Sequence, residues 1–128
     1  MGELEEMELN PEVIFFTAAH IPYDNFGKRS VDLVTSNVES IITLLHLYPE
    51  SKFVFASSVE VYGRNSNVIN EESSFELPSL YGLSKLAGEF VASAFAKHVI
   101  IRFSSIFGSG MRKDRFLYRI LDDARQNA

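Results

Sequence analysis

Residues 53–63 read FVFASSVEVYG: a continuous apolar run gives way to two serines, a glutamate and a closing glycine. A short run rich in aromatic and β-branched residues predicts a strand. The absence of polar alternation indicates that both faces of this strand are covered, as is typical of parallel sheets in α/β proteins. The stretch therefore predicts a buried parallel strand over Phe53–Ala56, with polar groups gathered at its carboxyl end.

Two similar runs lie on either side, at Val13–Thr17 and Val99–Phe103, and each predicts another buried strand. Between the three runs lie two longer segments whose apolar residues recur at helical spacing, at Ser30–Tyr48 and Ser79–Lys97. The alternation of strand and helix predicts right-handed crossovers between parallel neighbours. The fold class is therefore α/β, a doubly wound parallel sheet with flanking helices.

The second helical segment follows Pro78, and Ser79 is its expected N-cap. Its inward side is predicted to be apolar, formed by Leu83, Leu86, Ala87, Phe90, Val91 and Ala94. A further helix is predicted over Lys113–Gln126, after the flexible turn Gly108-Ser109-Gly110.

The composition fits one globular domain and excludes several functions. With 128 residues and 46% hydrophobic residues, the chain can bury a core. A formal net charge of -5 disfavours nucleic acid as a partner, and the chain has no cysteine for a disulfide or a thiolate metal site. The acidic start and the lack of an apolar run of about 20 residues predict a cytoplasmic protein with no membrane partner. No metal is predicted, because His46 and His98 lack the paired spacing of a metal site.

Polar and small residues follow each predicted strand, at the edge where open α/β sheets bind ligands. They are Ala18, Ala19 and His20 after the first, Ser57 and Ser58 after the second, and Ser104 and Ser105 after the third. The second group is the most informative, because Glu60 accompanies its two hydroxyls.

Tyr81 and Lys85 are four residues apart at the start of the second helical segment, so they share one face. A tyrosine with a pKa of about 10 is a poor base at neutral pH, but a nearby positive charge favours the phenolate. Lys85, together with an oxidised nicotinamide ring, would supply such charge. Tyr81 would then accept a proton from a substrate hydroxyl, with Ser58 hydrogen-bonding the same oxygen.

Taken together, these features resemble the extended short-chain dehydrogenase/reductase family, in particular its NAD-dependent epimerase/dehydratase branch. The resemblance runs from about Glu12 to Asn127. The residues that show it are the strand ending in Ala18-Ala19, Asn37-Val38, the run 57–63, Glu71 ahead of Pro78, the run 81–85, Glu89, and Arg102 with Phe107-Gly108. The resemblance implies a partial Rossmann-like fold, NAD or NADP as cofactor and a nucleotide-sugar substrate.

The family's site residues carry over onto matching positions of this sequence. Tyr81 would be the catalytic base, Lys85 would bind the nicotinamide ribose and tune Tyr81, and Ser58 would be the third catalytic hydroxyl, also touching substrate. The cofactor would be lined by Ala18, Ala19, Ser57, Tyr81 and Lys85. Asn37 would lie near the active-site backbone, and Ser105 near the sugar nucleotide. Two roles stay open for Glu60: a catalytic carboxylate, or an anchor for its loop.

The sequence also departs from the family pattern, since Gly2 is the only glycine before Gly27 and no glycine-rich phosphate turn is seen. We therefore expect residues 1–128 to form a single incomplete domain that binds NAD weakly or not at all by itself. The uncovered edge of its sheet predicts self-association. Isomerase, lyase and oxidoreductase chemistry all remain open, as does a truncated, non-catalytic chain that serves as an interaction module.

Overall fold

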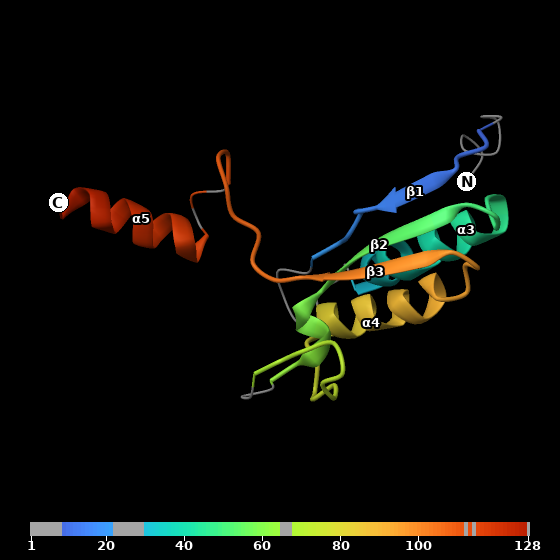
Figure 1. Cartoon of the computed structure of the whole chain (residues 1–128). Coiled ribbons are helices and arrows are strands. Elements are labelled where there is room, and N and C mark those ends of the chain that lie inside the picture. The colour runs from blue at the N-terminus through green and yellow to red at the C-terminus, as the bar shows by residue number, and fades with distance from the viewer. Residues whose placement is uncertain (1–8, 22–29, 65–67, 112, 114, 128) are drawn as a thin grey trace.

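Three parallel strands form one sheet in the order β1-β2-β3 (Figure 1). The structure is a computed structural model that describes residues 9–21, 30–64, 68–111, 113 and 115–127. The strands are β1 (Val13–Phe16), β2 (Lys52–Ser58) and β3 (His98–Phe103). All three predicted strands are present, and their parallel pairing brings their carboxyl ends to one edge, as expected.

The first helical segment is interrupted, although its spacing predicts one helix over Ser30–Tyr48. It consists of α2 (Ser30–Val34), the π-helical turn η1 (Thr35–Glu39) and α3 (Ser40–Leu47). The wider turn contains Asn37, which is fully buried and hydrogen-bonds outside its own helix. A π-turn inserted in an α-helix changes the direction of the side chains that follow, and such turns are frequent at functional sites.

The second helical segment forms α4 (Leu80–Ala92), and Ser79 is its N-cap as predicted, accepting a hydrogen bond from the backbone N–H of Gly82 at 3.0 Å. The predicted end at Lys97 is wrong. The Ser93 hydroxyl donates back to the Glu89 carbonyl, and the backbone N–H of Phe95 bonds the carbonyl of Ala92 in a tighter turn. The chain then enters β3.

The predicted inward face of α4 is only partly right: Leu86, Ala87 and Val91 are half-buried, and Val91 packs against the core. The buried residues are small or polar: Gly82, Ser84, Lys85, Gly88, Glu89 and Ala92. Leu83 and Phe90, which were expected to face inward, are 53% and 72% exposed. The reason is close packing, because a Cβ at Gly88 would lie 2.8 Å from the Phe55 ring and 2.9 Å from the Asn37 carbonyl oxygen.

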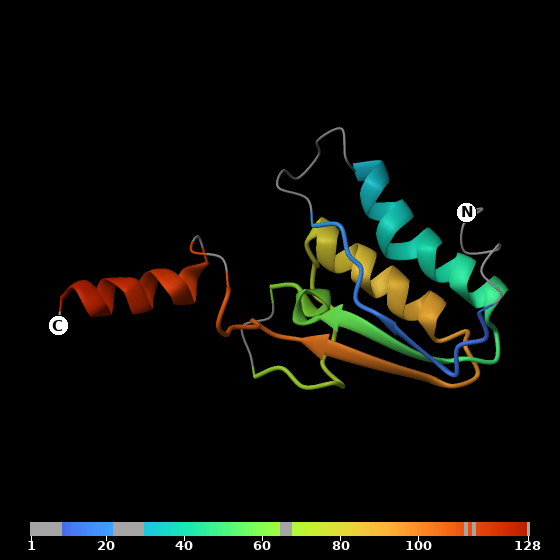
Figure 2. The same ribbon diagram turned by 90° about the horizontal axis from the view of Figure 1, so that it is seen from above.

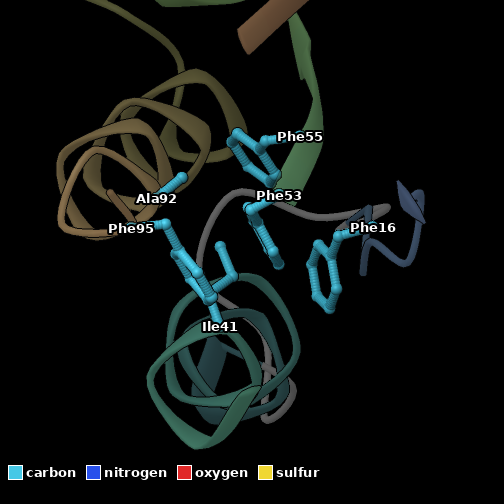
Figure 3. Packing of buried hydrophobic residues seen from close by; sticks show 6 residues of the cluster. All are labelled: Phe16, Ile41, Phe53, Phe55, Ala92 and Phe95. Atoms are coloured by element: carbon cyan, nitrogen blue, oxygen red, sulfur yellow. The ribbon is translucent and has the colours of Figure 1, made fainter. Parts of the chain in front are cut away.

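The core lies between the sheet and the helices α3 and α4. Its buried residues are Phe16, Ile41, Phe53, Phe55, Ala92 and Phe95 (Figure 3). The rings of Phe53 and Phe95 stack with centroids 4.3 Å apart. Both α3 and α4 contribute to this cluster, so they cover the same face of the sheet (Figure 2).

Alternate strand residues point to the other face and are exposed, among them Val13, Phe15, Val99, Ile101 and Phe103. The last helix, α5 (Phe116–Gln126), begins later than the predicted Lys113 and lies away from the sheet in both views (Figures 1 and 2).

Candidate functional site

The candidate site lies at the carboxyl edge of the sheet, where the parallel register places the predicted residues. Ala18 and Ala19 follow β1 and are exposed. Ser58 ends β2 and is half-buried, whereas Ser105 lies beyond β3 and is exposed.

The two serines of β2 have different roles in the structure. Ser57 is buried, and its hydroxyl donates to the Glu89 carboxylate at 2.6 Å, so it faces α4. The Ser58 hydroxyl accepts from the backbone N–H of Glu60 at 3.2 Å and caps the 3₁₀ turn η2 (Val59–Tyr62). Of the two, Ser58 is the one whose hydroxyl is not bound to a buried carboxylate.

Lys85 is only 2% exposed, and its ammonium is held against the end of β2. Its Nζ donates to the Ala56 carbonyl at 2.7 Å and lies 4.6 Å from the centre of the Phe55 ring. Burial lowers the pKa of Lys85 to about 8, while the negative charge of Glu89 acts in the opposite direction. One of its three N–H donors is thus committed to the backbone.

Tyr81 lies one helical turn before Lys85 and is half-buried. Burial raises the pKa of Tyr81, and the nearby Glu60 carboxylate raises it further. This direction is opposite to the lowering expected from Lys85. The ammonium is directed to Ala56, and among the described residues hydrogen bonds join Tyr81 neither to Lys85 nor to the Ser58 hydroxyl.

Glu60 fastens η2 to the start of α4. Its carboxylate accepts from the Ser79 hydroxyl at 2.7 Å, and the same hydroxyl oxygen caps α4. Gly82 makes the approach possible, since a Cβ there would lie 2.2 Å from the Glu60 carbonyl oxygen. In this structure Glu60 therefore has the contacts of a loop anchor.

A surface pocket of about 630 Å³ opens beside Glu60, between η2, the chain before α4 and the first turns of α4. Arg64, Leu77 and Leu83 contribute to its lining, which is mainly apolar. Tyr81 does not line it. Glu60, whose charge acts on Tyr81, does line it.

Asn37 joins the segment after β1 to α4. Its side-chain oxygen accepts from the His20 backbone N–H at 2.8 Å, and its amide donates to the His20 carbonyl at 3.1 Å and to the Ser84 hydroxyl at 2.9 Å. Ser84 in turn donates to the Tyr81 carbonyl at 2.7 Å. Asn37 thus contacts the backbone of the segment after β1 and, through Ser84, the backbone of Tyr81.

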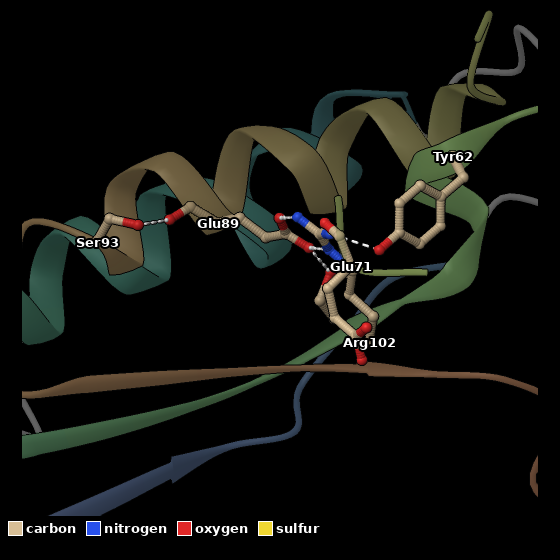
Figure 4. Close-up of polar contacts among 6 residues, drawn as sticks. Tyr62, Glu71, Glu89, Ser93 and Arg102 are labelled. Atoms are coloured by element: carbon tan, nitrogen blue, oxygen red, sulfur yellow. Dashed lines mark hydrogen bonds and ion pairs between the residues drawn. The ribbon is translucent and has the colours of Figure 1, made fainter. Parts of the chain in front are cut away.

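A second polar network was not predicted from the sequence (Figure 4). Arg102 binds Glu89 through two parallel bonds, from Nε at 2.9 Å and from Nη2 at 2.7 Å. Its third nitrogen, Nη1, donates to the Tyr62 hydroxyl at 2.6 Å and to the Glu71 carbonyl at 3.2 Å. The hydrogen bonds to Glu89 are the main reason that the pKa of Arg102 is raised. One feature of the sequence could have indicated this network: Glu89 follows Lys85 by one helical turn and lies on the same helix face.

The described residues hold neither a metal cluster nor a membrane-spanning helix. They contain no group of three or more metal-binding side chains, and none of their helices is both long and apolar enough to span a bilayer.

The parallel sheet with its crossover helices defines an α/β protein of the partial Rossmann-like kind. The chain belongs to the NAD dependent epimerase/dehydratase family, whose model matches residues 3–128.

Similar sequences are nucleotide-sugar epimerases by name. An uncharacterized UDP-glucose epimerase of Bacillus subtilis (strain 168) is 31% identical over 120 residues, which cover 86% of this chain and 38% of that protein. A UDP-glucose 4-epimerase of Mycoplasma genitalium is 30% identical over 114 residues, covering 79% of this chain and 34% of that protein. The chain thus spans less than two fifths of the length of these two relatives.

Similar solved structures contain NAD. The UDP-glucuronic acid 4-epimerase of Bacillus cereus in complex with NAD has a TM-score of 0.75 and 27% identity, covering 91% of this chain and 40% of that one. A short-chain dehydrogenase/reductase superfamily protein of Agrobacterium tumefaciens with bound NAD has a TM-score of 0.77 and 26% identity, covering 99% of this chain and 44% of that one. The likeness confirms the expected fold and family.

Proposed function

We propose that the protein takes part in NAD-dependent conversion of a nucleotide sugar, with epimerisation at a ring carbon as the reaction. Family membership and the names of the relatives support the reaction class. The observation that carries the proposal is the placement of Tyr81 and Lys85 on the first two turns of α4, beside the carboxyl end of β2. No other described tyrosine has a lysine one turn after it on the same helix.

The residues at this edge fit a nicotinamide nucleotide by their chemistry. Exposed Ala18 and Ala19 leave space for a flat ring, Lys85 has N–H donors beyond the one given to Ala56, and Ser58 offers a hydroxyl. When bound, the nicotinamide supplies a reversible hydride acceptor. We propose NAD rather than NADP, because NAD is the cofactor in the similar structures.

The chain's own groups would move the proton. Tyr81 would accept the proton of a sugar hydroxyl, and Ser58 would donate a hydrogen bond to the same oxygen as negative charge develops there. The Tyr81 pKa is raised by burial and Glu60, so additional positive charge near the phenol is needed for it to act as a base at neutral pH. An oxidised nicotinamide ring would bring such charge.

Tyr81→Phe tests the proposal, because it removes the hydroxyl and keeps the ring. In the full-length protein, supplied with NAD and UDP-glucose or UDP-glucuronic acid, we expect turnover to fall by about 10²- to 10⁴-fold, the usual contribution of an acid–base group. Epimerisation is followed by chromatographic separation of the two sugar nucleotides. Tyr48→Phe, at the far end of α3, is the matched control. Activity kept within a factor of about three would remove Tyr81 from the mechanism.

The alternative is a non-catalytic interaction module that keeps the family fold. The observation that favours it is electrostatic: the protein's own groups raise the pKa of Tyr81, and the Lys85 ammonium is directed to the backbone. Calorimetric titration of the full-length protein with NAD and with NADP separates the two, since an enzyme of the proposed kind binds one of them saturably. Heat from neither titration, together with no turnover, would favour the module.

A further inference from the structure

Arg102 connects four separate segments of the chain through one side chain. It lies on β3 in register with Ser57 on β2, so both side chains point toward α4, where Glu89 receives both of them. Its remaining nitrogen reaches the Tyr62 hydroxyl at the end of η2 and the Glu71 carbonyl in the loop that follows. Figure 4 shows the guanidinium between the helix and the Tyr62 ring.

The contacts on η2 fix that turn at both ends. At its start the Ser58 hydroxyl caps the turn through the Glu60 N–H, and at its end Tyr62 is held by Arg102. The guanidinium carbon also lies 4.9 Å from the Tyr62 ring centre and 5.3 Å from that of Phe75. Between these two ends lies Glu60, whose backbone carbonyl packs against Gly82 and whose carboxylate acts on the Tyr81 phenol.

We propose that Arg102, oriented by Glu89, is a positioning residue that holds the segment carrying Ser58 and Glu60 in place against the helix that carries Tyr81. The inference rests on the proposed function, in which Ser58 and Tyr81 act on one oxygen. Glu89 follows Tyr81 on α4 by eight residues, about 12 Å along a rigid helix, so a fixed Glu89 fixes both parts of the site. The hydrogen bonds of Arg102 go to Glu89, Tyr62 and Glu71, so it contacts neither Ser58 nor Tyr81 through them.

The fork geometry is essential to this role. A guanidinium makes two parallel bonds to a carboxylate and still directs a third nitrogen elsewhere, whereas an ammonium acts as a point charge on a flexible stem. Arg102→Lys keeps the positive charge beside Glu89 but loses the simultaneous reach to Tyr62. Tyr62→Phe removes only the hydroxyl that Arg102 binds and keeps the ring, so it is the more selective variant.

Kinetics of the full-length protein test the positioning. For Tyr62→Phe and Arg102→Lys we expect kcat to fall by about 10-fold or more, with KM values for NAD and the sugar nucleotide little changed, because a small misplacement of reacting groups is costly. Glu71→Gln is the control, since Arg102 uses only the backbone carbonyl of Glu71. An unchanged kcat in both variants, whatever their Tm, would overturn the proposal and leave the network a purely stabilising role.

Hydrogen exchange separates this inference from the proposed function. The backbone N–H groups of Gly63, Arg64 and Glu76 are bonded within or beside η2, and in Arg102→Lys we expect them to exchange faster while those of α3 do not change. If the unsubstituted protein converts no sugar nucleotide, the proposed function fails and exchange alone decides whether Arg102 fixes η2. Unchanged exchange at these three amides would overturn that as well.

Discussion

At the scale of single residues, the phenol of Tyr81 is governed by its surroundings on α4 and η2. Burial and the Glu60 carboxylate both favour the protonated form, whereas the Lys85 charge is directed to Ala56. The protein's own groups therefore favour the protonated phenol of Tyr81, with a pKa above its ordinary value. Glu60 thus affects the chemistry of Tyr81 through its charge as well as anchoring the loop through Ser79.

Glu60→Gln is expected to lower the pKa of Tyr81 toward its ordinary value, because the substitution removes a negative charge and keeps an oxygen that accepts from Ser79. The ultraviolet absorbance of the phenolate, taken as the difference from the same titration of Tyr81→Phe, measures this pKa. If Tyr81 is the base, the pH above which kcat rises will move down with it.

Ser79→Ala is the control for this substitution, since it removes the same hydrogen bond without altering charge. It is expected to cost about 1 kcal/mol of stability through loss of the α4 cap. A Tyr81 pKa that moves equally in both variants would assign the effect to loop geometry and not to the carboxylate.

Lys85 gives a pH dependence of stability whose sign follows from its lowered pKa of about 8. Between pH 8 and about 10 the unfolded chain holds the lysine proton more tightly than the folded one, so the free energy of unfolding rises with pH there, by about 2 kcal/mol. Below about pH 7 both states are almost fully protonated and the contribution is constant. Lys85→Met should abolish the slope in urea unfolding at several pH values; an unchanged slope would show that other groups cause it.

The residue types at the site were predictable from the sequence, but their partners were not. The i, i+4 spacing placed Tyr81 and Lys85 on one helix face, and the structure confirms that both lie on the first turns of α4. The direction of the Lys85 ammonium depends on the Ala56 carbonyl, which comes from a different element. Spacing along a chain contains no information about such a contact.

At the scale of elements, α4 shows where apolar periodicity misleads. Spacing cannot show which face of a helix packs inward when that face is occupied by small and polar residues, as it is here. Gly88 allows α4 to approach both β2 and the π-turn, and Glu89 faces inward because Ser57 and Arg102 hydrogen-bond to it. The early end of α4 likewise follows from Phe95, which must reach the core to stack on Phe53.

Gly88→Ala is expected to destabilise the fold by about 1–3 kcal/mol, because the new methyl group would overlap the Phe55 ring and the Asn37 carbonyl oxygen. This cost exceeds the gain of about 1 kcal/mol that alanine normally brings to a helix. Gly108→Ala serves as control, since a Cβ at Gly108 would meet nothing within 4 Å. Urea unfolding gives both values, and a stabilised Gly88→Ala would contradict the close approach.

At the scale of the whole molecule, the order of strands and helices was predictable because each buried run is separated from the next by one amphipathic segment. Parallel pairing in the order β1-β2-β3 then follows from the crossover rule. The position of α5 was not predictable, since its sequence indicates a helix but not what it packs against. The pattern of apolar runs likewise did not show that one face of the sheet has no described helix packed against it.

The polypeptide of residues 1–128, prepared by itself, is expected to self-associate through its exposed strand residues. Phe15 is 72% exposed on the face opposite the helices, and β1 is an edge strand. Sedimentation velocity over a range of concentrations measures the association. Phe15→Lys should weaken it, whereas Phe90→Lys, on the helical side, should not. A monomer at all concentrations would contradict the prediction.

The pairing of Tyr62 with Arg102 has one practical consequence. The chain has no tryptophan, so its intrinsic fluorescence comes from its 5 tyrosines alone. A phenol that accepts a hydrogen bond from a cation and lies against its charge emits differently from one in water. Comparing the emission of the unsubstituted chain with that of Tyr62→Phe therefore gives an optical signal for the state of this contact, with no label attached.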